Sequence, residues 1–149
     1  MKAQIATRAD VASWLELVCE VELLFGPMPD FEETLLQKID ERAAFCVRSD
    51  QRDKPTTVRG GMLLGGTREH GWIRWLAVRS SARRLGIGQC LVEEAIMAMK
   101  GANTISLDTF REENALGWPA RRLYARMGFV AGPLVLHEGM PRQRFDLRS

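Results

Sequence analysis

The sequence predicts an α/β or α+β domain, with helices on the faces of a mixed sheet. Apolar patterns alternate in the order strand, two helices, three strands, helix, strand, helix, two strands. One of these units, the strand at 72–78, a helix and the strand at 104–110, is a right-handed crossover by default. A chain of 149 residues, 46% of them hydrophobic, fits one domain over residues 1–149 with a sizeable core.

The first third predicts a short strand and two helices. Residues 2–7 suit a strand, and Asp10 is expected to cap a helix over about 10–24. The GPMP stretch at 26–29 breaks that helix, and Asp30 is expected to cap a second one that extends to about Arg42.

The middle of the chain predicts three strands, at 43–48, 58–66 and 72–78, joined by turns at 49–57 and 66–71. Gly60 and Gly61 lie inside the second of these strands. Glycine in a strand marks either a bulge or a close approach of another backbone.

The last part predicts a helix after Gly88, whose apolar stripe faces a sheet and which Gly101 can end. Pro119 suits the first turn of a further helix, which should stop at Gly128. Strands are expected near 129–136 and 142–147.

Composition excludes several classes of protein. The formal net charge of +2 does not favour a nucleic-acid-coating surface. Cys19, Cys46 and Cys90 are widely spaced and form no CxxC pair, so we expect no disulfide framework and no metal site. A reducing cytoplasm fits this cysteine usage. No signal peptide is apparent, and no apolar run approaches the roughly 20 residues of a membrane helix, so no membrane association is expected.

The stretch RRLGIG, residues 83–88, joins an apolar strand to an amphipathic helix. Glycines let the backbone turn sharply, and a helix start offers unpaired N–H groups at the positive end of its dipole. Such a turn suits an anion, a pyrophosphate above all. The P-loop pattern is absent, and Leu91 stands where a dinucleotide-binding fold needs its third glycine.

Two blocks of sequence resemble the GNAT superfamily of acyl-CoA-dependent N-acetyltransferases. The first is Leu76-Ala77-Val78 followed by Arg83-Arg84-Leu85-Gly86-Ile87-Gly88. The second is ARRLYARMGF, residues 120–129, which matches the family's A-x-x-L-Y-x-x-x-G-F. The resemblance implies a twisted, mostly antiparallel sheet of about six or seven strands flanked by about four helices. The first third of the chain matches the family only in its helical character.

The resemblance also implies a cofactor, acetyl-CoA, with no metal. Leu76, Ala77 and Val78 would pair with its pantetheine arm as an added strand would. The N–H groups of Arg84, Leu85, Gly86, Ile87 and Gly88, with Gln89, would hold the pyrophosphate, and Arg83 would add charge. The family often has an asparagine where this chain has Gly117; either a lengthened loop brings Asn114 to the cofactor, or that contact is lost.

The expected reaction is direct transfer of the acetyl group to a primary amine in a ternary complex, because neither motif contains a cysteine that could carry it. Tyr124 would act as general acid toward the departing thiolate, or would merely pack. The base is open between His70, Glu69 and an ordered water. Phe25 and Met28 could line the acceptor site, or belong to the core.

Two alternatives to an enzyme remain open. One is a non-catalytic acyl-CoA-binding or regulatory module, and the other is an RNA- or ribosome-associated protein, suggested by the arginines at 121–126. If the chain is an enzyme, its acceptor is a small molecule or a peptide: amino acids, polyamines, aminoglycosides, protein N-termini and lysines all fit. A homodimer is common in such folds but is indicated by no residue here.

Overall fold

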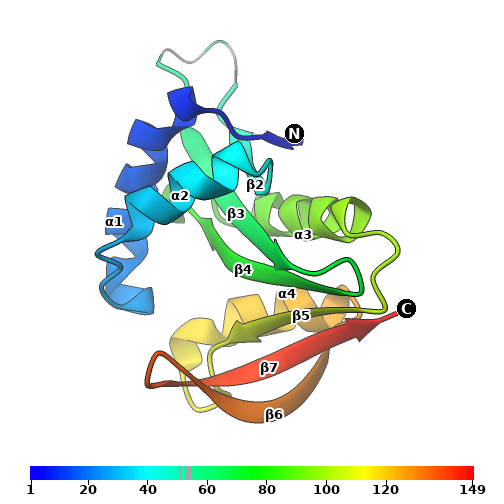
Figure 1. The fold of residues 1–149 in the computed structure, drawn as a ribbon. Coiled ribbons are helices and arrows are strands. Elements are labelled where there is room, and N and C mark those ends of the chain that lie inside the picture. Colours follow the sequence, from blue (N-terminus) through cyan, green and yellow to red (C-terminus); the bar gives the residue numbers. More distant parts are fainter. Residues whose placement is uncertain (51, 53–54) are drawn as a thin grey trace. The chain divides into compact units, whose positions relative to one another are not determined.

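A computed structural model describes residues 1–50, 52 and 55–149. In that part of the chain four α-helices and seven strands form the expected mixed fold (Figure 1). The strand order is β1-β2-β3-β4-β5-β7-β6. The strands are β1 (Ala3–Ile5), β2 (Ala44–Arg48), β3 (Val58–Gly66), β4 (His70–Val78), β5 (Thr104–Thr109), β6 (Val130–His137) and β7 (Met140–Arg148).

The helices lie where the apolar periodicity predicts them. They are α1 (Val11–Phe25), α2 (Phe31–Asp40), α3 (Ile87–Ala98) and α4 (Trp118–Arg126). Short 3-10 turns occupy Arg8–Asp10, Ser80–Ala82 and Ala115–Gly117. The predicted turn at 49–57 includes residues 51, 53 and 54, which lie outside the described residues.

Contacts divide the chain into two compact units. The first comprises Met1–Leu64 and Trp75–Ala95, and the second comprises Gly65–Arg74 and Ile96–Ser149. Strand β4 and helix α3 contribute residues to both.

In the first unit, helices cover both faces of β3, and the two glycines show why. A Cβ on Gly61 would meet the indole ring of Trp14 on α1, whereas a Cβ on Gly60 would meet Ile87 and Leu91 of α3. Successive residues of a strand face opposite ways, so α1 and α3 pack on opposite faces. Gly61 therefore marks the close approach of a side chain, not of a backbone as predicted, while Gly60 has side chains and the backbone carbonyl of Ala77 beside it. The bulge of this β-hairpin lies at Val47/Arg48.

The core on the α1 side of the first unit is centred on aromatic and aliphatic side chains. Trp14, Leu17 and Leu35 are fully buried there, packed with Cys46 and Leu63 of the sheet. Burying each such side chain stabilises the fold by about 1.5–3 kcal/mol.

Asp10 does not cap α1 as predicted: no hydrogen bond joins its side chain to the helix start. Its carboxylate instead accepts the Thr7 N–H at 2.8 Å and pairs with Arg48 through Nη2 at 2.8 Å. Burial alone would raise the pKa of Asp10, but the hydrogen bonds from Arg48 and Thr7 outweigh it and lower that pKa. Asp30 likewise makes no side-chain cap to α2.

In the second unit the sheet presents two different faces. β5 pairs in parallel with β4 and antiparallel with β7, and β7 pairs with β6. On one face, Phe145 of β7 packs against Tyr124 of α4. On the other face, Ser106 lies between Asp146 and His70 and is hydrogen-bonded to both. None of the described helices is long and apolar enough to cross a membrane.

Candidate active site

The turn between β4 and α3 adopts an unusual backbone conformation. Arg84 has φ 66° and Gly86 has φ 83°, both in the left-handed region that favours glycine. Residues 83–86 are exposed, and a Cβ added to Gly86 would meet no atom within 4 Å. The turn is therefore open to a ligand on the side of Gly86.

The backbone N–H groups of residues 84–89 have no acceptor among the described residues; the first amide of the helix to find one is that of Cys90, bonded to Gly86 O at 3.0 Å. A 12-residue helix begins at Ile87, so these donors lie at the positive end of its dipole. Unpaired amides in a turn of this shape form an anion-binding concavity.

Packing holds this turn in place from both sides. Ile87 is buried, and with Leu91 it lies against Gly60 of β3. At the end of β4, Arg79 donates to Val58 O at 2.6 Å and to Ser13 O at 2.8 Å. The Ser80 N–H reaches the Glu20 carboxylate at 2.8 Å. The donors of the turn are thus preorganised by the core of the first unit.

The strand that precedes the turn ends in Leu76, Ala77 and Val78, as the motif predicts. Ala77 is buried in the core cluster, while Leu76 and Val78 are half-buried. Together with the turn they form a continuous segment of the first unit, from Leu76 to Gln89.

Tyr124 lies in the second unit, on α4. Its ring is buried, with its centroid 6.0 Å from that of Phe129 and 6.3 Å from that of Phe145. Burial raises the pKa of the phenol well above its usual range. Tyr124 therefore keeps its proton at any physiological pH and can serve as a hydrogen-bond donor.

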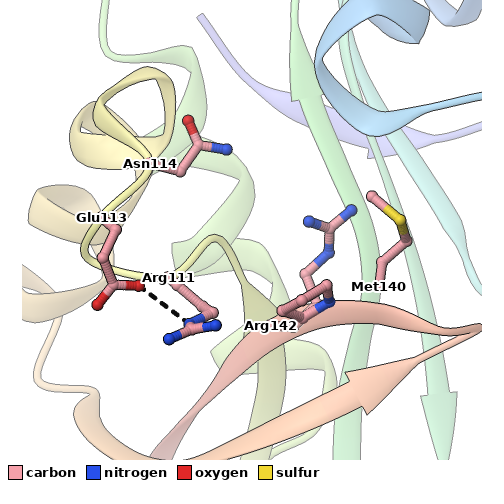
Figure 2. Close-up of a pocket in the computed structure, with 6 residues that line it drawn as sticks. Arg111, Glu113, Asn114, Met140 and Arg142 are labelled. Carbon is pink, nitrogen blue, oxygen red and sulfur yellow. Dashed lines mark ion pairs between the residues drawn. The ribbon is translucent and has the colours of Figure 1, made fainter.

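The loop between β5 and α4 explains the departure of Gly117 from the family pattern. A Cβ on Gly117 would collide with the side chain of Phe110, so no asparagine fits there. Asn114 accepts the Leu116 N–H at 3.1 Å and lines a cavity of about 300 Å³ (Figure 2).

The two candidate bases lie at the beginning of β4. His70 is the first residue of the strand, not part of a turn as predicted, because Thr67 and His70 close a tighter turn through two hydrogen bonds. Its Nε2 is 2.6 Å from Ser106 Oγ. Ser106 donates its hydroxyl proton to Asp146, so its Oγ is left to accept a hydrogen bond from an Nε2–H of His70. Glu69 is exposed, and its carbonyl accepts the Asn103 N–H.

Phe25 and Met28, the candidate acceptor residues, pack partly buried against the core of the first unit. The ring of Phe25 meets that of Trp75 edge to face, with centroids 5.9 Å apart. Their contact with an acceptor stays a prediction.

Sequence patterns did not single out two groups of the second unit. The Asp146–Ser106–His70 chain spans three strands, and only knowledge of the register could have joined its members. Arg142, which lines the cavity with Arg111, gave no signal of its own, because in the sequence it is only one charged residue near the start of a predicted strand. Among the described residues no three His, Cys, Asp or Glu side chains form a group that could hold a metal ion.

Comparisons with known proteins agree with this geometry. Residues 35–131 match the family model described as "Acetyltransferase (GNAT) domain". A GNAT-family acetyltransferase from Bacillus cereus shares the fold, with a TM-score of 0.75 and 16% identity over 99% of this chain and 96% of that one. So does the ribosomal-protein-S18-alanine N-acetyltransferase from Escherichia coli, with a TM-score of 0.75 and 18% identity over 99% and 92%.

A chain in the NatC complex bound to Gag peptide and CoA is also similar, with a TM-score of 0.77 and 22% identity over 100% of this chain and 99% of that chain. A search of curated protein sequences gave no significant match. The family model spans both sequence blocks and well over half of the chain. The chain therefore belongs to the acetyltransferase (GNAT) domain family and is an acyltransferase.

Proposed function

We propose that this protein transfers an acetyl group from acetyl-CoA to a primary amine by direct attack in a ternary complex. The observation that carries the proposal is the run of unpaired amides over residues 84–89, in an open turn at a helix start. The structural relative captured with CoA supports the choice of cofactor.

The turn would bind the diphosphate of the cofactor. Its amides donate to phosphate oxygens, and Arg83, which is exposed beside them, contributes a positive charge. The pantetheine arm is itself an amide chain and would extend along the backbone of Leu76–Val78, as an added strand does. This cofactor supplies the activated acetyl group, which is carried as a thioester.

The reaction needs a neutral amine, because an ammonium has no lone pair. The amine nitrogen attacks the thioester carbonyl and forms a C–N bond, and the C–S bond then breaks. The leaving thiolate takes a proton from the Tyr124 phenol, which burial keeps protonated. The attacking nitrogen loses one proton to a base, and the phenolate regains one from solvent.

The base that takes the amine proton is one of three candidates: His70, Glu69 or an ordered water. His70 is chemically suited, because Asp146 supports its ring through Ser106, and a ring that donates through Nε2–H keeps Nδ1 as a proton acceptor.

A screen tests the proposal: acetyl-CoA is offered to an amine library, and thiol release is followed for the native protein and Tyr124→Phe. We expect transfer to at least one amine, with kcat lowered about 100-fold or more in the variant. Unchanged turnover in Tyr124→Phe would remove the acid role. Tight CoA binding without transfer to any amine would favour the acyl-CoA-binding module instead.

A further inference from the structure

The second unit contains a cavity of about 300 Å³, widely open to solvent, that is not used in the reaction proposed above. Its volume is at the lower end of small-molecule sites. Figure 2 shows it between two chain segments, the loop that follows β5 and the start of β7. It is lined by Arg111, Glu113, Asn114, Met140, Pro141 and Arg142.

The two arginines in this cavity are in different electrostatic situations. Arg111 Nε is 3.0 Å from the Glu113 carboxylate, an ion pair that offsets its charge although Nε makes no hydrogen bond to a described residue. Arg142 has no acidic partner among the described residues, and its guanidinium lies over the ring of Phe110, 5.0 Å from the centroid. The lining therefore has one positive charge in excess.

No neighbouring acid on β5 or β7 is available to Arg142. Asp108 is already bound in a two-point pair by Arg144, with Nε to Oδ1 at 2.9 Å and Nη2 to Oδ2 at 3.2 Å. Asp146 accepts the Ser106 hydroxyl. Arg142 is half-buried, so its charge is only partly solvated. A guanidinium in this setting binds a carboxylate strongly, because its planar fork donates two parallel hydrogen bonds.

The other residues that line the cavity indicate what else the ligand contains. Met140 and Pro141 offer apolar surface, and Asn114 has a side-chain NH₂ that donates to no described residue. The loop that carries Arg111 and Asn114 leads directly into α4, the helix of Tyr124. The cavity is thus connected through a short, structured segment to the residue assigned to the leaving thiolate.

We propose that this cavity is the specificity site for the acceptor, and that Arg142 binds a carboxylate on the molecule that presents the amine. The proposal rests on the acetyl-transfer function above. Acceptors are then amino acids or short peptides with an acidic group, and polycations such as polyamines and aminoglycosides are disfavoured by the excess charge.

Matched acceptors test this proposal. In 6-aminohexanoate and its carboxamide the amine is far from the changed group and has almost the same basicity, so a difference between them reports the carboxylate. We expect kcat/KM to be about 10- to 100-fold higher for the acid, the worth of a hydrogen-bonded charge pair. In Arg142→Gln the preference should disappear, and in Arg142→Glu it should reverse toward 1,6-diaminohexane.

Two controls separate specificity from folding and from cofactor binding. Arg68→Gln makes the same charge change at an exposed position outside the cavity and should keep the native preference. The Kd for CoA should be the same in Arg142→Gln and native protein. Equal kcat/KM for acid and carboxamide in the native protein would overturn the proposal, as would a loss of CoA affinity in Arg142→Gln as large as the loss for the acceptor.

The proposal can fail separately from the transfer function. Calorimetry with 6-aminohexanoate and its carboxamide, in the presence of CoA, measures the cavity without any turnover. Stronger binding of the acid that depends on Arg142 supports the cavity even if no transfer is seen. Transfer to amines with no preference for a carboxylate would leave the enzyme assignment standing and remove this one.

Discussion

The buried phenol of Tyr124 makes a prediction about stability as well as one about catalysis. Burial raises the folded-state pKa of Tyr124 above its value of about 10 in an unfolded chain. Below that pH both states keep the proton. Above it the unfolded state loses the proton first, so the stability falls as pH rises toward the folded-state pKa.

Thermal unfolding from pH 8 to pH 11.5 measures this effect in native protein and Tyr124→Phe. The melting temperature of the native protein should fall more steeply above about pH 10 than that of the variant, which has no phenol to ionise. Parallel curves would show that the phenol is not buried in solution.

The Asp10–Arg48 pair makes the opposite pH prediction. Its surroundings lower the pKa of Asp10, so the stability it contributes is present above the unfolded-state value of about 3.9 and is lost as pH falls below it. Asp10→Asn should reduce the free energy of unfolding by about 2–4 kcal/mol at pH 7, because Arg48 would lose its charged partner.

Denaturant unfolding at pH 7 and pH 3 checks this, with Asp40→Asn as control. Asp40 pairs with Arg8 at the surface, where both side chains are more than 60% exposed, so its loss should cost less than about 1 kcal/mol. Equal effects of the two substitutions would contradict the assignment of Asp10 as a buried structural acid.

The function of the turn at 83–89 depends on the strand and the helix that it joins. Gly86 has φ 83° and open space at its Cβ position. Gly86→Ala should cost about 1 kcal/mol of stability from the left-handed backbone alone. We also expect about tenfold weaker CoA binding, because the methyl group and any backbone shift disturb the amides that face the diphosphate.

Gly101 supplies a matched control for this change. It ends α3 with φ 102° and equally open space, so Gly101→Ala carries the same backbone cost at the other end of the same helix. The two variants should unfold alike, while only Gly86→Ala should bind CoA more weakly in calorimetry. A similar loss of affinity in both would mean that the effect comes from helix stability.

The elements were largely predictable, because their apolar spacing and their glycine and proline punctuation are local properties. The α3 stripe, the start of α4 one residue before Pro119 and the strand with Gly60 and Gly61 all follow from a few neighbouring residues. The capping role of Asp10 was wrong, since Arg48 is 38 residues away and the attraction of a charged partner exceeded that of the helix start.

The site was predictable only in part, because only some of its residues are neighbours in the sequence. The turn of residues 83–88 is contiguous in sequence, so its open amides could be expected. The surroundings of Arg142, Asp108 and Ser106 depend on the register of β5 and β7, which the sequence pattern does not determine. Substrate recognition therefore became visible only with the fold.

Direct transfer requires the protein to bind both substrates at once. Cys46 is buried, and burial raises its pKa to about 12, which makes it a poor nucleophile. Cys19 is exposed on α1, and Cys90 is half-buried on α3. Double-reciprocal plots of initial rate at several concentrations of the second substrate should intersect, and the double variant Cys19→Ser with Cys90→Ser should retain transfer. Parallel lines in those plots, or a double variant that loses activity while it still binds CoA, would indicate an acetyl-cysteine intermediate.

Calorimetry with CoA and with pantetheine, which has the same arm but neither the diphosphate nor the phosphorylated adenosine, tests whether the turn holds the cofactor. The unpaired amides of residues 84–89 predict submillimolar binding of CoA and binding of pantetheine at least about 100-fold weaker, since most of the charge-assisted hydrogen bonds are lost. No binding of CoA in this range, or equal binding of the two ligands, would contradict the claim that this turn holds the cofactor.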